Sequence, residues 1–127
     1  MSEERAPQVR IALAEDEPDI RVTFVRLLEQ LGHKVVCAAS NGEELIEHCL
    51  QEEVDLVFVD FDMPIMDGLA AAEHVGLRGI PVILISGHPD ADLVVVEKEP
   101  VVMRIRKPVT IEALQNAIRQ ALPAEQR

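Results

Sequence analysis

Four short apolar runs, each leading into polar or charged residues, constrain the fold of this chain most strongly. The runs are Val9–Ala14, Leu56–Val59, Val82–Ile85 and Val101–Met103. Apolar runs of this length are typical of strands that are buried on both faces of a parallel sheet. The polar residues that follow them are Glu15-Asp16-Glu17, Asp60, Ser86 and Lys107. Because ligands bind at the carboxyl ends of strands in an open parallel sheet, these side chains are the candidate functional residues.

Helical patterns alternate with the strands. Pro18 suits the first turn of a helix that has acidic residues such as Glu17 at its positive end, and Gly32 closes it. Asn41 with Glu44 three residues later predicts a capping box, and Thr110 predicts the cap of the last helix. The expected strands are Val9–Ala14, Lys34–Ala39, Leu56–Val59, Val82–Ile85 and Val102–Ile105, and a short helix is expected at Leu69–Val75. The pattern predicts an α/β, doubly wound domain with helices on both faces.

The stretch Asp90–Glu99 fits this pattern least well. It contains the consecutive valines Val94, Val95 and Val96 and lies between two prolines. Because β-branched residues disfavour helices, the sequence predicts a short, distorted or mobile helix there.

Composition limits the function classes. A length of 127 residues fits one domain, and we expect a leader at 1–8, the domain at 9–122 and a tail at 123–127. The formal charge of −11 argues against a nucleic-acid partner. No apolar stretch approaches the roughly 20 residues that span a bilayer, and the first ten residues include four charged ones and do not resemble a signal peptide, so we expect a cytoplasmic protein without a membrane partner. Cys37 and Cys49 are expected to be buried, reduced thiols.

The polar residues at the strand ends resemble a known motif set. It consists of Glu15-Asp16, Asp60 followed by Met63-Pro64-x-x-Asp67-Gly68, Ser86, and Lys107-Pro108. In this order they resemble the receiver domain of bacterial two-component response regulators, in a stand-alone form like the chemotaxis regulators. The resemblance implies a flavodoxin-like sheet of order 2-1-3-4-5. It also implies a signalling domain, not an enzyme, that takes a phosphoryl group on Asp60 from a histidine kinase or phosphotransfer protein and then switches partner binding.

The chemistry of such a site requires a cation. Two unit charges 4 Å apart interact by about 4 kcal/mol at an effective dielectric near 20, so carboxylates and a phosphoryl donor repel each other unless a hard cation such as Mg²⁺ intervenes. The resemblance implies that Asp16 and Asp60 bind Mg²⁺ directly and Glu15 through water. It also implies a ligand from the backbone carbonyl of Asp62, whose side chain either tunes water attack on the phosphoaspartate or faces solvent. Ser86 and Lys107 would contact the phosphoryl group.

Two further expectations come from the resemblance. The Lys107–Pro108 peptide is expected to be cis. Where the family has an inward-turning aromatic switch residue, this chain has Arg104. A long cation is costly to bury, so we expect Arg104 to stay at the surface. Signalling would then rely on ordering Asp90–Glu99, with Arg104 as a partner-binding charge.

Two alternatives compete with this interpretation. Asp60-Phe61-Asp62, a later Ser and a downstream Lys also resemble the motifs of haloacid-dehalogenase-type phosphohydrolases. Those enzymes place the nucleophilic strand first and the acidic metal pair last, whereas Glu15-Asp16 precedes Asp60 here. A degenerate receiver that acts only as a binding module is disfavoured because every site residue is present.

Overall fold

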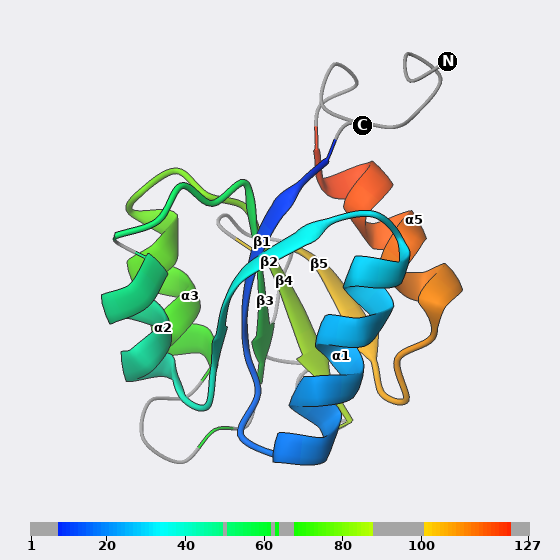
Figure 1. Cartoon of the computed structure of the whole chain (residues 1–127). Helices are drawn as coiled ribbons and strands as arrows, with labels where there is room; N and C mark the ends of the chain where they lie inside the picture. The colour runs from blue at the N-terminus through cyan, green and yellow to red at the C-terminus, as the bar shows by residue number, and fades with distance from the viewer. Residues whose placement is uncertain (1–7, 50, 62, 64–67, 88–100, 123–127) are drawn as a thin grey trace.

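The computed structural model describes residues 8–49, 51–61, 63, 68–87 and 101–122. Within these residues strands alternate with helices (Figure 1). The elements are β1 (Arg10–Ala14), α1 (Pro18–Gln30), β2 (Lys34–Ala39), α2 (Gly42–Cys49), β3 (Leu56–Asp60), α3 (Gly68–Gly76), β4 (Val82–Ser86), β5 (Val101–Arg106) and α5 (Ile111–Ala121). None of the helices in the described ranges is long and apolar enough to cross a bilayer.

The sheet has five parallel strands in the order β2-β1-β3-β4-β5, as the resemblance implied. The chain moves outward from β1 to β2 and then crosses back to β3 on the other side of β1. Ala14 lies opposite Val59, so β1 and β3 end side by side at the lower edge of the sheet in Figure 1. This reversal of strand order is the point at which open α/β sheets bind ligands.

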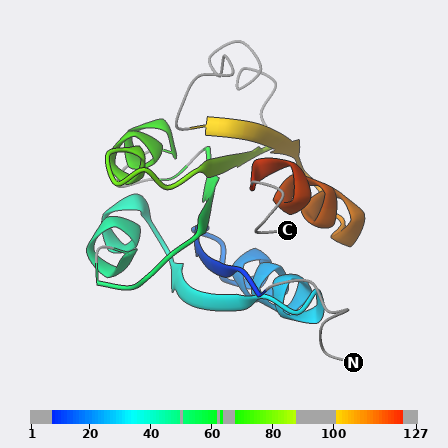
Figure 2. The ribbon, with the colours of Figure 1, turned by 90° about the horizontal axis from the view of Figure 1, so that it is seen from above.

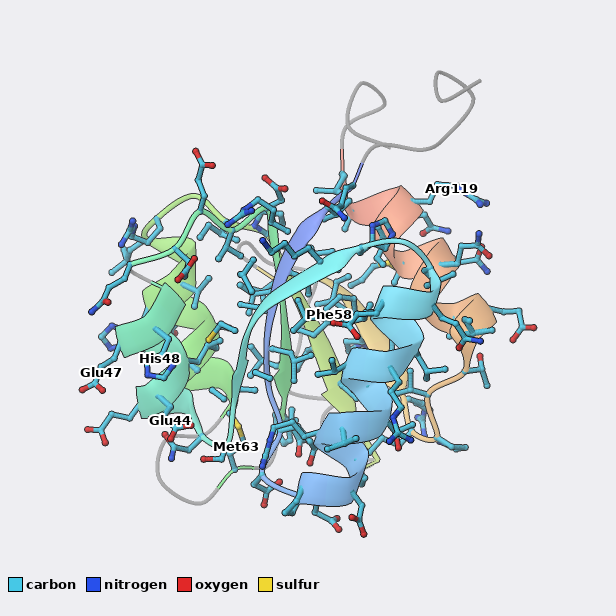
Figure 3. All side chains as sticks on the ribbon, viewed as in Figure 1. Glu44, Glu47, His48, Phe58, Met63 and Arg119 are labelled. Carbon is cyan, nitrogen blue, oxygen red and sulfur yellow. The ribbon has the colours of Figure 1, made fainter. Side chains whose placement is uncertain are left out.

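Helices cover both faces of the sheet (Figure 2). On one face α2 and α3 pack against alternate strand residues such as Val57 and Val59, and on the other α1 and α5 pack against Leu56 and Phe58. The ring of Phe58 lies between α1 and the sheet (Figure 3), with its centroid 5.5 Å from that of Phe24. Both faces of the central strands are buried, which explains why their sequences are apolar throughout.

The helix ends follow local rules with one difference. Gly32 adopts the left-handed conformation after α1, with φ of 92°, and the Thr110 side chain accepts a hydrogen bond from the Ala113 N–H at 3.1 Å. Asn41 Oδ1 accepts from the Glu44 N–H at 2.8 Å, as a capping box requires. The Glu44 carboxylate, however, accepts from the Ser40 N–H instead of the Asn41 N–H, so the second half of the box is shifted by one residue.

The element bounds lie within two residues of the sequence prediction. The main change is that β3 and β4 each include one more residue, Asp60 and Ser86, and both side chains are buried. Cys37 is buried, as predicted, while the side chain of Cys49 and the stretch Asp90–Glu99 lie outside the described residues.

Candidate functional site

Three acidic residues meet at the carboxyl ends of β1 and β3. Glu15 and Asp16 directly follow β1, and Asp60 is the last residue of β3. Each offers a carboxylate oxygen, and these oxygens all lie within 4.8 Å of one another. The parallel register of the two strands therefore brings together residues that are about 45 positions apart in sequence. We call Glu15, Asp16 and Asp60 the acidic cluster.

Two members of the acidic cluster are buried, and burial makes their negative charge less favourable. Glu15 is 2% exposed and Asp60 is 4% exposed, while Asp16 is partly exposed. Burial raises the pKa of Glu15 to about 7; the Glu17 N–H acts in the opposite direction, and the charge of Asp60 adds to the rise. A site that crowds carboxylates in this way favours a bound cation, and an all-oxygen donor set suits Mg²⁺.

Lys107 lies next to the acidic cluster. Its Nζ is 3.4 Å from Asp60 Oδ2 and 3.4 Å from Glu15 Oε1. Burial disfavours the positive charge of Lys107, but attraction to Asp60 and Glu15 outweighs this effect, so the pKa of the ammonium is raised. The Lys107–Pro108 peptide is cis, which confirms the expectation from the resemblance. The lysine therefore lies where it can balance negative charge at Asp60.

Ser86 ends β4, the strand beside β3. Asp60 lies opposite Ile85 in the register, and Ser86 is the next residue. Ser86 is 9% exposed, and its carbonyl accepts the Lys107 N–H at 3.0 Å. This backbone hydrogen bond holds Ser86 and Lys107 together at the same edge of the sheet as Asp60.

The loop after β1 is held by its neighbours. The Glu15 N–H donates to the Ala39 carbonyl of β2 at 3.0 Å, and the Glu17 N–H donates to Glu15 Oε2 at 3.1 Å. The Arg21 side chain, from α1, donates through Nη1 to the Glu15 carbonyl at 2.8 Å. Arg21 was not among the residues predicted from the sequence; the signal available was an arginine one turn after the start of a helix that follows an acidic pair.

The remaining predicted residues are either outside the described residues or not part of the acidic cluster. Asp62, with its proposed carbonyl ligand, and Asp67 lie outside the described residues. Met63 is buried in the core on the α2 and α3 face of the sheet. Arg104 is exposed on β5, as predicted, but the segment proposed to act with it is not among the described residues.

Comparisons with known proteins identify the family. A model of the response regulator receiver domain matches residues 11–119. Over 115 residues the chain is 32% identical to the transcriptional regulatory protein PdtaR of Mycobacterium tuberculosis, covering 89% of this chain and 56% of that protein. Over 132 residues it is 33% identical to hybrid signal transduction histidine kinase K of Dictyostelium discoideum, covering 94% of this chain and 11% of that protein. The chain thus spans about half of the first relative's length and a small part of the second's.

The solved structures agree with the family model. A response regulator receiver domain protein from Clostridium thermocellum superposes with a TM-score of 0.79 at 30% identity, covering 89% of this chain and 93% of that one. Receiver domains are signalling domains rather than enzymes that turn over an external substrate, and they bind Mg²⁺ at an acidic pocket. The matched fold, the family model and the acidic cluster at the switch point together establish that this chain belongs to the response regulator receiver domain family.

Proposed function

We propose that this receiver domain accepts one phosphoryl group on Asp60, in a reaction that requires Mg²⁺. The observation that carries the proposal is the convergence of Glu15, Asp16 and Asp60 with the ammonium of Lys107, 3.4 Å from Asp60. Asp60 needs no base to activate it, because an ordinary carboxylate is ionised at neutral pH. The obstacle to the reaction is charge repulsion, and the residues around Asp60 are the kind that reduce it.

The acidic cluster would hold the Mg²⁺ ion. Asp16 and Asp60 supply direct carboxylate ligands in this proposal, Glu15 binds through water, and the backbone carbonyl of Asp62 completes the protein ligands. When bound, the ion supplies positive charge that offsets the repulsion between the carboxylates and an incoming phosphoryl group. The donor set fits this role because it contains only oxygen atoms and the three carboxylate oxygens lie within 4.8 Å of one another.

Lys107 and Ser86 would bind the phosphoryl group. The Lys107 ammonium contacts Asp60 Oδ2, so it lies where it could bind an oxygen of a phosphoryl group on Asp60. Ser86 supplies a hydroxyl donor from the end of the neighbouring strand. Arg104, exposed on β5, is the proposed switch position and would offer its charge to a partner. We assign these roles to a receiver unit at 9–122, a range that includes the matched residues 11–119.

The phosphoryl donor would be a histidine kinase or a histidine phosphotransfer protein. Receiver domains accept phosphoryl groups from histidine kinases, and one relative bears the name of a hybrid histidine kinase. The phosphorylated domain would then bind a protein target, and slow self-dephosphorylation would return it to the resting state.

Incubation with acetyl phosphate and Mg²⁺, followed by intact mass measurement, tests the proposal. We expect one phosphoryl group per chain in the wild type, and none in Asp60→Asn or after chelation of Mg²⁺. Asp19→Asn is the matched control, because it makes the same chemical change at an exposed residue of α1 outside the acidic cluster. Undiminished labelling of Asp60→Asn would overturn the assignment, and sustained turnover of a small phosphate ester would indicate a phosphohydrolase instead.

A further inference from the structure

Arg21 makes a contact that none of the roles above requires. It is a partly buried residue of α1, and its Nη1 donates a hydrogen bond of 2.8 Å to the backbone carbonyl of Glu15. This carbonyl belongs to the peptide group that joins Glu15 to Asp16. Arg21 therefore fixes the orientation of the peptide between two members of the acidic cluster.

The same short loop is held at two other points. The Glu15 N–H donates to Ala39 of β2, and the Glu15 carboxylate accepts the Glu17 N–H. In both of these hydrogen bonds the donor is a backbone N–H, whereas in the Arg21 hydrogen bond the donor is a side chain. Its contribution can therefore be removed by substitution while the other two donors stay in place.

The orientation of this peptide matters because Mg²⁺ tolerates little distortion of its coordination geometry. Mg²⁺ requires nearly ideal octahedral coordination at short distances, unlike the more adaptable Ca²⁺. The Asp16 carboxylate follows directly from the peptide that Arg21 holds, while the Asp60 carboxylate is fixed separately at the end of β3. Rotation of the Glu15–Asp16 peptide would move one ligand relative to the other and weaken the site.

We infer that Arg21 is a positioning residue that sets the Mg²⁺ affinity of the acidic cluster through the Glu15–Asp16 peptide. The inference rests on the proposed function, since it requires that the cluster bind Mg²⁺. Residues that orient metal ligands typically contribute about 10- to 100-fold to metal affinity. Loss of a single charge-assisted hydrogen bond to the backbone corresponds to the lower end of this range.

Calorimetric titration of the full chain with Mg²⁺ tests this inference. The variants are Arg21→Ala and the control Arg26→Ala, which removes the same charge from an exposed position of the same helix. We expect Arg21→Ala to weaken Mg²⁺ binding roughly tenfold, and Arg26→Ala to change it by no more than about twofold, as for other surface substitutions. Equal affinities in the two variants would overturn the inference.

Ionic strength separates positioning from simple charge. An effect that came only from the guanidinium charge at a distance would diminish at high salt, since the Debye length is about 3 Å at 1 M. We expect the ratio of wild-type to Arg21→Ala affinity to persist when the titrations are repeated in high salt. Collapse of that ratio toward one would contradict a positioning role.

Unfolding by urea without Mg²⁺ provides the second readout. A purely structural role for Arg21 would lower the free energy of unfolding but leave the Mg²⁺ affinity of the folded protein unchanged, and that result overturns the inference. If Arg21→Ala does not fold, Arg21→Gln takes its place with the same expected loss of affinity. Absence of Mg²⁺ binding in the wild type would overturn the proposed function as well, whereas wild-type binding without loss in the Arg21 variants would overturn this inference alone.

Discussion

At the scale of single residues, Lys107 places a positive charge beside two buried carboxylates. Its Nζ is 3.4 Å from an oxygen of Glu15 and from an oxygen of Asp60, two carboxylates that burial makes costly to leave ionised without a partner. In the proposed phosphorylated state the same ammonium contacts the phosphoryl group. Lys107 would then leave these carboxylates to Mg²⁺.

This contact predicts the effect of Lys107→Ala on metal binding. The variant should bind Mg²⁺ as tightly as the wild type or more tightly, because removal of the lysine leaves more negative charge at the acidic cluster. Its spectrum of backbone amides should no longer show the full change that beryllofluoride, a phosphoryl mimic, produces in the wild type. Calorimetry and NMR measure the two effects, and Lys34→Ala, an exposed lysine on β2, is the control. A large fall in Mg²⁺ affinity would contradict the assigned role.

The sequence predicted the members of the site better than their environment. Asp16, Asp60 and Lys107 could be predicted because each lies at or just after the end of a strand, and parallel strands end at one edge of the sheet. The burial of Glu15 and its contact with Arg21 could not be predicted, since both depend on how the first turn of α1 lies over the preceding loop. Helical periodicity gives the face on which Arg21 lies but not the atom that it reaches.

At the scale of elements, the turn between α1 and β2 is hydrogen-bonded to Val9, the residue that precedes β1. His33 Nδ1 accepts the Val9 N–H at 3.2 Å, and the Lys34 N–H donates to the Val9 carbonyl at 3.0 Å. Gly32 makes the turn possible through its positive φ. Burial lowers the pKa of His33 below its ordinary value of 6.5, and protonation at Nδ1 would remove the acceptor for Val9.

This arrangement predicts a pH dependence of stability. Below the unfolded-state pKa of 6.5 the unfolded chain takes up a proton that folded His33 does not, so the free energy of unfolding falls as the pH drops from 6.5 toward the lower folded-state pKa. Urea unfolding at about pH 7.5 and about pH 5.5 measures this loss. His33→Gln should lose less stability than the wild type between the two conditions, and His74→Gln, an exposed histidine of α3, should behave like the wild type. Identical losses in all three proteins would contradict the prediction.

The element boundaries were largely predictable because local signals agree with the packing. Gly32 and Thr110 end and begin their helices as expected, and all five strands were found within two residues of their bounds. The shift of the Glu44 carboxylate to the Ser40 N–H was missed, since a capping box in sequence does not specify which of two neighbouring N–H groups the carboxylate reaches.

At the scale of the whole molecule, the acidic cluster concentrates negative charge in a chain whose formal net charge is already −11. A cation that binds the folded state and not the unfolded state stabilises the fold by mass action. Folding and Mg²⁺ binding should therefore be linked.

This linkage predicts a measurable gain in stability. At a Mg²⁺ concentration of 100 times the dissociation constant, the free energy of unfolding should rise by about 2.7 kcal/mol. Asp60→Asn, which removes one carboxylate from the cluster, should show a smaller rise. Urea unfolding with NaCl at matched ionic strength is the control, because salt alone screens repulsion in an acidic chain. An equal rise with NaCl would indicate screening and not a specific site.

Asp60 is proposed as the residue that receives the phosphoryl group, and peptide mapping provides the decisive test. The wild-type chain is incubated with acetyl phosphate and Mg²⁺, the acyl phosphate is trapped by borohydride reduction, and the digested protein is sequenced by tandem mass spectrometry. We expect the reduced residue at Asp60 and at none of the other carboxylates of the acidic cluster. Reduction at Glu15 or Asp16 in place of Asp60 would contradict it.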